Sequence, residues 1–545
     1  MRRSNAKRLL LAGLLALAAA GVTSAQASAA TLTVCPSGCA FNQLDPAIAA
    51  ASNGDTIQVA AGTYDGGFTI NKSLKLLGAG AGSTIIKGGG PVVTVGVLNA
   101  ASEPTVSIAG VTITGGVNTS SPFPFVARGG GIDVPRAANF APGATLTITD
   151  SVISGNRTAP SAATDSGLPC PPDITITCIN GDLPFAAARG AGIATSGQLT
   201  LKNTVVRDNV CASSVVSDAE GCGIFSLAGS SVSLSDSTVT GNVASAVAPN
   251  GRFADAGGIF ASGTLTIDGS LISGNSASLS TAMPNDVPFG TQANSGGVHV
   301  LGDDSCARPG ACAIGKIRNS TITGNSVTAS NSLGDALDFC GGICDDGQLT
   351  VSDSLVGNNH VTATVPSGSA ACACADSAGI GTGGIESIHE THVTGNTVTA
   401  SAPDGTASAS SGGGSDGNDV SNTITDSLFS GNQITATTTT GTATVQGAGF
   451  TNFAVLTIRG TTFSHNSGTA TGPSGTAHGG GLFNGAFFGG PGKLSLIDSA
   501  IVDNTLSGGP DITIQGGGLF TTVPVTLKDS TISGNTPDNC FGVSC

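Results

Sequence analysis

The chain has 545 residues, of which 82 are glycine, 10% are charged and none is tryptophan. Its 35 acidic residues outnumber 20 basic ones, which disfavours nucleic acid or an anionic lipid surface as a partner. Such a composition can indicate disorder, but the aliphatic residues recur in short alternating triplets that are typical of strands. A repeat array also lets a long chain form one domain, because each unit packs on its neighbours.

Residues 1–30 have the pattern of an export signal. Four basic residues precede an apolar run over 9–20, and small residues with the A-x-A cleavage pattern follow at 25–29. The run is too short to cross a bilayer, and no later stretch is apolar enough to anchor the chain. Without this segment 16 basic residues face 35 acidic ones, a net charge of −19. We therefore expect a secreted, extracellular product that is not inserted into a membrane.

Fourteen cysteines follow the export segment in seven close pairs, which is typical of disulfides formed in an oxidising compartment. The candidate disulfide cysteines are Cys35 and Cys39, Cys170 and Cys178, Cys211 and Cys222, Cys306 and Cys312, Cys340 and Cys344, Cys372 and Cys374, and Cys540 and Cys545. Because one residue separates Cys372 from Cys374, these two could instead cross-link to Cys340 and Cys344 on a neighbouring unit. A four-thiolate zinc site built from the same four residues is the less favoured alternative.

About eleven imperfect copies of one phrase follow each other along the chain. It reads LTITDSVISGN at 146–156, LTIDGSLISGN at 265–275 and VTLKDSTISGN at 525–535. The intervening copies end in Asn209, Asn242, Asn325, Asn358, Asn396, Asn432, Asn466 and Asn504. The first and last final asparagines are 379 residues apart over ten intervals, so the mean period is about 38 residues.

Each part of the phrase predicts a piece of one coil. The Leu-Thr-Ile stretch has the period of a strand with one face inward, and Asp-Ser and Ser-Gly form turns. A second aliphatic pair begins another strand, Gly-Asn makes a corner in which Asn tolerates left-handed dihedral angles, and a Gly-Gly-Ile strand closes the coil. We therefore predict an all-β chain: a single-stranded right-handed parallel β-helix with three parallel sheets and about fourteen coils. The final asparagines of stacked coils are expected to form a hydrogen-bonded ladder rather than a ligand site.

The segment between the final Asn and the next Gly-Gly varies from about 8 to about 30 residues, as in Thr158–Arg189 and Thr397–Asp416. Variation at one fixed point predicts loops along one edge of the solenoid, which is the usual binding face of such arrays. Several of these loops contain Thr-Ala-Thr alternation, which suggests hairpins.

Residues 47–64, AIAAASNGDTIQVAAGTY, resemble the N-terminal cap and first coil of pectin-lyase-like β-helix proteins. The resemblance implies a short helix that covers the open end of the core, followed by a strand from Ile57. The later units are similar to polymorphic-outer-membrane-type repeats of bacterial β-helix proteins. The implied organisation is an export signal at 1–30, a cap and first coils at 31–115, repeat coils with variable loops at 116–536 and a disulfide-tied tail at 537–545. This fold hosts lyases, hydrolases, adhesins and structural proteins, so the resemblance implies architecture rather than activity.

No catalytic constellation is visible in the sequence. Asp303-Asp304 and Asp345-Asp346 are the only Asp-Asp steps, and both are interpreted as solvated loop acids whose adjacent side chains point apart. His389 and His392 lack the spacing of a zinc motif, and the single calcium-like segment at 412–419 is interpreted as a flexible loop. Four phenylalanines are possible exposed rings: Phe123, Phe125, Phe487 and Phe488. No cofactor or metal is therefore expected.

These observations favour a secreted, non-catalytic protein that presents variable loops to a glycan, a cell wall or another protein. The alternative is a polysaccharide lyase or glycoside hydrolase whose residues the sequence does not reveal. A third interpretation is a structural spacer. The sequence sets no oligomeric state.

Overall fold

A computed structural model of the chain describes residues 29–120, 126–161, 164–169, 182–212, 215, 217–247, 251–285, 291–302, 313–417, 421–486 and 492–545. Residues 1–28 of the expected export signal lie outside these ranges. The other predicted residues that lie outside them are Phe123, Phe125, Cys170, Cys178, Asp303, Asp304, Cys306, Cys312, Asp419, Phe487 and Phe488.

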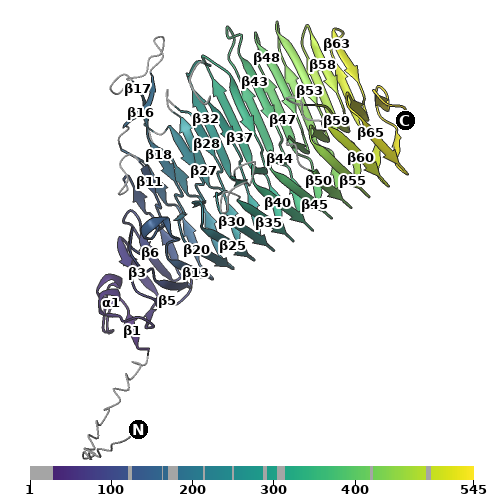
Figure 1. Ribbon diagram of the computed structural model, residues 1–545. Coiled ribbons are helices and arrows are strands. Elements are labelled where there is room, and N and C mark those ends of the chain that lie inside the picture. The colour runs from purple at the N-terminus through teal and green to yellow at the C-terminus, as the bar shows by residue number, and fades with distance from the viewer. Residues whose placement is uncertain are drawn as a thin grey trace, which may run out of the picture.

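The described chain winds into stacked coils whose strands run parallel, which confirms the predicted right-handed parallel β-helix (Figure 1). One coil contains, in order, β30 (Thr264–Asp268), β31 (Leu271–Ser273), β32 (Ser276–Thr281), β33 (Gln292–Asn294) and β34 (Val298–Val300). We name the sheets that contain these strands A, B, D, E and C, respectively. Within the described ranges sheet A has 15 strands, sheets B and C have 14 each, and sheets D and E have 11 each.

The prediction of three sheets is wrong for most of the molecule, because two further sheets accompany sheets A, B and C. The early coil of β2 (Thr56–Val59), β3 (Gly62–Asp65) and β4 (Phe68–Ile70) has three strands. Sheets D and E begin with β10 (Val117–Asn118) and β11 (Val126–Arg128).

The extra strands come from the segments that were expected to be loops or hairpins. Their Ala–Thr alternation has the period of a strand, and each pairs in parallel with the same segment of the next coil. Among the described residues the one antiparallel pair is β16 (Thr164–Pro169) with β17 (Asp182–Phe185).

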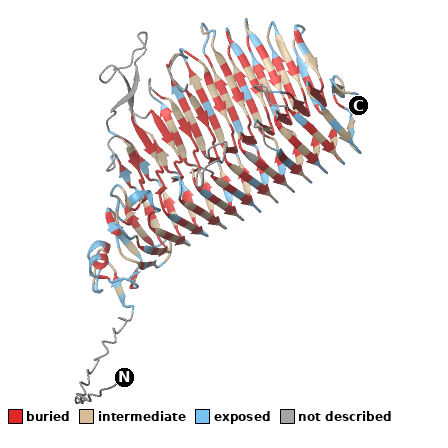
Figure 2. Ribbon diagram, in the orientation of Figure 1, coloured by how far each residue is buried: buried red, intermediate tan, exposed pale blue. Residues whose placement is uncertain are grey.

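Two large clusters of buried hydrophobic side chains hold the coils together, and buried residues recur along successive strands (Figure 2). Sheets A, B and C enclose Ile, Leu, Val and Phe side chains, whereas sheets D and E pack against each other around small residues, mostly alanine. We call sheets D and E together the plate. The plate core includes Ala244, Ala246, Ala277, Ala329, Ala363, Ala400, Ala407, Ala436 and Ala443.

The ends of the solenoid are covered by short elements. Helix α1 (Leu44–Ala50) buries Leu44, Ala47 and Ile48 against the first coils, as the resemblance implies. At the other end β67 (Cys540–Phe541) extends sheet C beyond β64 (Leu519–Thr521). In the described part of the chain we find no helix with the length and apolarity to cross a membrane.

Five disulfides lie in the described ranges, and each joins cysteines that are close in sequence. They are Cys35–Cys39, Cys211–Cys222, Cys340–Cys344, Cys372–Cys374 and Cys540–Cys545. Cys372 and Cys374 thus pair with each other, so the alternative cross-link to the neighbouring coil and the four-thiolate zinc site are both wrong. As residues i and i+2 of one strand, their side chains share a face, which brings the two sulfurs together.

An asparagine ladder runs through the solenoid after the sheet B strands. Each amide Nδ2 donates to the Oδ1 of the next asparagine at 2.9–3.1 Å and also to a backbone carbonyl of the preceding coil, and the last member, Asn535, donates to Asn539. The members are Asn156, Asn209, Asn242, Asn275, Asn325, Asn359, Asn396, Asn432, Asn466, Asn504 and Asn535. The sequence assignment of Asn358 is wrong by one residue: Asn358 (φ 53°) takes the left-handed corner that Gly155 and Gly274 take in other coils.

We expect Asn359→Ala to lower the free energy of unfolding by about 3 kcal/mol or more, because it leaves several buried polar groups unpaired at about 1–3 kcal/mol each. The orphaned groups are the backbone N–H and Nδ2 of Asn325 and the carbonyl of Ile322. The midpoint of thermal unfolding, followed by circular dichroism, measures the effect. Asn358→Gly is the matched control and should change the midpoint little, since glycine occupies this corner elsewhere. Equal shifts for the two variants would contradict the assignment.

Three carboxyl groups lie inside the two cores without full hydrogen bonding. Asp338 of β38 (Ala336–Phe339) accepts one backbone N–H in the plate core, and Asp345 of β39 (Ile343–Asp345) accepts one from Gly347. Neither oxygen of Glu386, in β45 (Ile385–His389), has a partner among the described residues. Burial raises the pKa of all three carboxyls, that of Asp345 to about 7, and the nearby Asp416 and Asp345 carboxyls add to the shift of Glu386.

The stability of the fold should therefore depend on pH through Asp345. Between the ordinary pKa of 3.8 and about 7 the folded protein holds a proton on Asp345 that the unfolded chain has released, so this group's contribution to stability falls as pH rises across that window. Asp345→Asn should flatten the decline of the thermal midpoint from pH 4 to pH 7. Asp353→Asn, at an exposed corner, is the control and should leave the profile unchanged. A profile of Asp345→Asn parallel to that of the unchanged protein would disprove this role.

Candidate functional site

A valley runs along the solenoid where sheet E turns into sheet C. In each coil its sides are the last residue of the sheet E strand and the middle residue of the sheet C strand, which points away from the main core. On the sheet E side lie Arg189, Glu220, Asp255, Asn294, Phe339 and Asp376. On the sheet C side lie Phe225, Phe260, His299, Cys344, Gly381 and Ser415. We call this feature the E–C valley.

The corner residue between the two sheets has a left-handed backbone in every coil from Gly129 onward. Glycine fills it near both ends of the valley, as at Gly221 and Gly447, but five consecutive coils use residues with a side chain, at φ between 42° and 59°. These are Ala256, Ser295, Cys340, Ser377 and Ser411. A non-glycine residue with a left-handed backbone lowers the stability of the fold by roughly 1–2 kcal/mol, and strain of this kind concentrates at functional sites.

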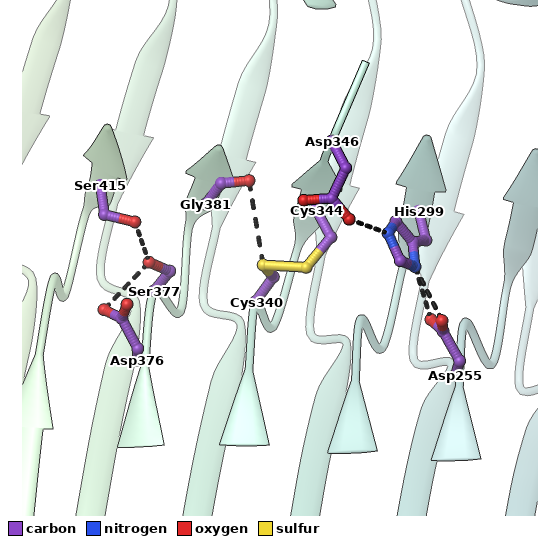
Figure 3. Close-up of a disulfide and its surroundings, with 9 residues drawn as sticks. All are labelled: Asp255, His299, Cys340, Cys344, Asp346, Asp376, Ser377, Gly381 and Ser415. Atoms are coloured by element: carbon purple, nitrogen blue, oxygen red, sulfur yellow. Dashed lines mark hydrogen bonds and ion pairs between the residues drawn. A yellow bond between two sulfur atoms is a disulfide. The ribbon is translucent and has the colours of Figure 1, made fainter. Parts of the chain in front are cut away.

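Three side chains from three successive coils form a hydrogen-bonded chain in the middle of the valley (Figure 3). His299 donates through Nδ1 to Asp255 at 2.8 Å and through Nε2 to Asp346 at 3.1 Å. The side chain of His299 is 3% exposed and that of Asp255 10%, whereas that of Asp346 is 42% exposed. This row of hydrogen bonds therefore begins in the interior of the protein at Asp255 and ends at the solvent-accessible carboxyl of Asp346.

The protonation states of His299 and Asp346 are set by the hydrogen bonds and charges that these residues share with each other and with Asp255. Burial opposes the protonation of His299, but the Asp255 and Asp346 carboxylates outweigh it and raise the pKa of His299 to about 10. Burial also acts against the charged form of Asp346, yet the hydrogen bond and charge of His299 lower the pKa of Asp346 below its ordinary value. At neutral pH His299 is an imidazolium that donates both N–H groups, and Asp346 is an ionised acceptor. Such a carboxylate can take a proton or attack a carbon atom.

Two hollows meet at this carboxyl. Both are lined by Gln292, Asn294, His299 and Asp346. The first hollow continues past the Cys340–Cys344 disulfide to Asp376, whose Oδ1 accepts hydrogen bonds from Ser377 (3.1 Å) and Ser410 (2.9 Å). Asp346 and Asp376 thus place two carboxyl groups on the wall of one hollow.

The second hollow has an aromatic floor and a charged rim. The rings of Phe225 and Phe260 stack with centroids 5.2 Å apart, and Phe260 meets the His299 ring edge-on at 5.4 Å. On the rim Arg189 pairs with Glu220 at 2.9 Å and lies over the Phe225 ring. Because these rings stack on each other and are only 2% and 5% exposed, they give the hollow an apolar lining beside its polar groups.

The structure changes the interpretation of the residues singled out in the sequence. Asp345 and Asp346 do point apart, but Asp345 is buried at the end of a strand, so the prediction of two solvated loop acids is wrong. Part of the calcium-like segment forms β49 (Gly414–Asp416) in sheet C, so the interpretation as a flexible loop is wrong for these residues, and Asp419 lies outside the described residues. His389 and His392 lie on the outer surface of sheets A and B, away from the valley. In the described part of the chain no three His, Cys, Asp or Glu side chains are arranged to hold a metal ion.

Sequence reasoning missed Asp255 and His299, the two residues that organise the site. The available signal was the register of the repeats. Aligning the Gly-Gly-Ile strands places His299 at the middle position that Phe260 and Cys344 occupy in neighbouring coils. Asp255 ends the sheet E strand one coil earlier, so the two side chains face each other across the corner.

Comparisons with known proteins report on the architecture. No family model and no curated protein matches the chain. Among solved structures it is similar to the A-module of the mannuronan C-5 epimerase AlgE6 from Azotobacter vinelandii, with a TM-score of 0.33 and 12% identity over 89% of this chain and 93% of that one. It is also similar to a mannuronic acid specific polysaccharide family 6 lyase from human gut microbiota (TM-score 0.31, 11% identity, 90% and 85% covered). Pectin methylesterase from carrot gives a TM-score of 0.25 at 12% identity, with 68% and 84% covered.

Proposed function

We propose that the chain hydrolyses glycosidic bonds in a neutral extracellular polysaccharide, with Asp346 as the reacting carboxylate. The observation that carries this proposal is the Asp255–His299–Asp346 chain, which ends on an accessible carboxyl where two hollows of the E–C valley meet. An elongated valley suits a polymer that extends across several coils.

Glycoside hydrolysis uses two carboxyl groups, one that protonates the leaving oxygen and one that acts as a base or nucleophile. Asp346, which His299 keeps ionised, suits the second role. Asp376 lines the same hollow and is the second carboxyl group that the reaction requires, held in place by Ser377 and Ser410. Asp255 is a positioning residue, because it acts on the reaction only through His299.

The charge of the valley favours a neutral substrate. Glu220, Asp346 and Asp376 line the hollows, and the cation Arg189 is already paired with Glu220. A polyanion would therefore be repelled, and a lyase acting on uronate residues would need a free cation to neutralise the substrate carboxylate. The apolar lining of the second hollow, which includes Leu227 and Leu301 beside the Phe rings, offers contact that does not depend on charge.

Catalysis is favoured over the non-catalytic binding that the sequence suggested. The segments then interpreted as variable binding loops are largely strands of the plate, whereas the polar groups of the valley converge on one point. The local disulfides agree with an oxidising, extracellular setting.

The test is release of reducing sugar from a panel of neutral and acidic polysaccharides by the purified chain. We expect turnover on a neutral polymer, and Asp346→Asn and Asp376→Asn should each lower kcat about 100-fold or more with little change in KM. Asp353→Asn, exposed and outside the valley, should keep full activity. Products that absorb in the ultraviolet through a new double bond would indicate a lyase instead. Glycan binding without turnover would restore the non-catalytic interpretation.

The effect of His299 on the ionisation of Asp346 can be tested through the pH dependence of kcat/KM. His299→Gln removes the positive charge that lowers the pKa of Asp346, so that pKa should rise. Because Asp346 must be ionised to act, the acidic limb of the kcat/KM profile should move to higher pH. A variant with lower activity but an unmoved acidic limb would show that His299 is only a structural support.

A further inference from the structure

The outer face of sheet D carries an extended array of hydroxyl groups. Seven successive strands form it, with mostly apolar residues and glycine, and also Thr281 and Asn331, pointing into the plate and mostly Ser and Thr pointing outward. The strands are β32 (Ser276–Thr281), β37 (Ser326–Asn331), β42 (His360–Thr364), β47 (Thr397–Ser401), β52 (Gln433–Thr437), β57 (Ser467–Thr471) and β62 (Thr505–Gly508). We call their outward side the hydroxyl face.

The outward residues form ranks in unbroken register across the strands. The central rank is Ser278, Thr328, Thr362, Thr399, Thr435, Thr469 and Ser507. A second rank beside it is Ser280, Ser330, Thr364, Ser401, Thr437 and Thr471. The third rank is Ser276, Ser326, His360, Thr397, Gln433, Ser467 and Thr505, so only two of its positions lack a hydroxyl group.

The hydroxyl face has no carboxylate, lysine or arginine, although the chain as a whole is acidic. The outer side of sheet A, built from the same coils, carries charged residues, as at Lys316, Arg459 and Lys493. An uncharged face on a charged molecule is complementary to an uncharged ligand. The hydroxyls from Ser278 to Thr435 in the central rank make no hydrogen bond with any part of the chain that the structure describes, so they are available to such a ligand.

The array is also rigid and regular in two directions. Parallel strands set the ranks' repeat at about 4.8 Å from strand to strand and at about 6.6 Å between alternate residues of one strand. The alanine core beneath keeps the two layers of the plate close together, and threonine side chains have restricted χ1 rotation. The hydroxyl groups are therefore held as a lattice before any ligand arrives.

We propose that the hydroxyl face binds ice. Ice is uncharged, is periodic in two dimensions with oxygen rows at spacings close to those of the ranks, and offers both donors and acceptors to a hydroxyl group. A crystalline polysaccharide is less suited, because its sugar rings pack best on aromatic side chains and the face has none apart from the imidazole of His360. A second copy of the chain is less suited too, since seven strands of five residues cover only about 550 Å², against roughly 800 Å² per partner in a stable complex.

The experiment measures thermal hysteresis and inhibition of ice recrystallisation by the purified chain. Both activities are expected, and Thr399→Tyr, at the centre of the array, should reduce them about tenfold, because a central position dominates a contact surface. Thr457→Tyr is the matched control. It places the same substitution on the outer side of sheet A, in β55 (Val455–Arg459) between Thr423 and Ser495, and should leave both activities intact. The thermal midpoints of both variants check that each is folded.

A folded chain with neither activity would overturn the proposal, and so would equal losses in the two variants. Sedimentation with crystalline cellulose or chitin, in the absence of any effect on ice, would identify a polysaccharide as the ligand and would also overturn it. The outcome is independent of the valley, because Asp346→Asn should retain the full effect on ice.

Discussion

Exact register between coils is the constraint on which the rest of this molecule depends. The asparagine ladder enforces it, because each amide bonds the coil before it and the coil after it, and a slip of one residue would leave buried donors and acceptors unpaired. A coil can therefore vary in length only outside its sheet A and sheet B strands. The chain varies in length in the connection between sheets D and E, and also between sheets C and A, where Val300 of β34 and Ile314 of β35 are much farther apart in sequence than Ala261 of β29 and Thr264 of β30.

Register also explains how residues that are distant in sequence build one site. Asp255, His299 and Asp346 are 44 and 47 positions apart, yet Asp255 directly precedes the corner between sheets E and C in its coil, and His299 and Asp346 follow that corner in the next two coils. Stacking therefore places them within hydrogen-bonding distance without any long-range loop. Stacking in register also produces the hydroxyl face, but there the sequence repeats the same residue types from coil to coil. The valley changes chemistry from coil to coil, as a site for one particular ligand requires, whereas the hydroxyl face repeats one chemistry, as a periodic ligand requires.

The sequence predicts the coil more completely than it predicts the plate. Aliphatic alternation, turn residues and the repeated Asn were sufficient for the β-helix, the capping helix and all but one member of the ladder, because each is a local pattern. The Thr-Ala-Thr segments were ambiguous: alternation predicts a strand, but whether its partner is the preceding segment or the next coil depends on stacking that a single copy does not show. The shift from Asn358 to Asn359 has a similar cause, since two adjacent asparagines both fit the corner and only burial distinguishes them. The site was missed because Asp255 and His299 carry no motif; their relation exists only between coils.

Asp345 and Asp346 show how the fold can give neighbouring, chemically identical groups different roles. The strand period sends Asp345 into the main core and Asp346 into the valley. Burial raises the pKa of Asp345 to about 7, and the unpaired Glu386 lies near enough for the two carboxyls to act on each other, whereas the imidazolium of His299 lowers the pKa of Asp346. Environments that separate the pKa values of paired carboxyls are the usual means by which a site obtains a protonated and an ionised group at one pH. Here the separation has a structural consequence as well. If Asp345 were ionised, a negative charge would lie directly behind Asp346 and would raise its pKa, so the neutral state of the buried neighbour supports the ionised state of the exposed one.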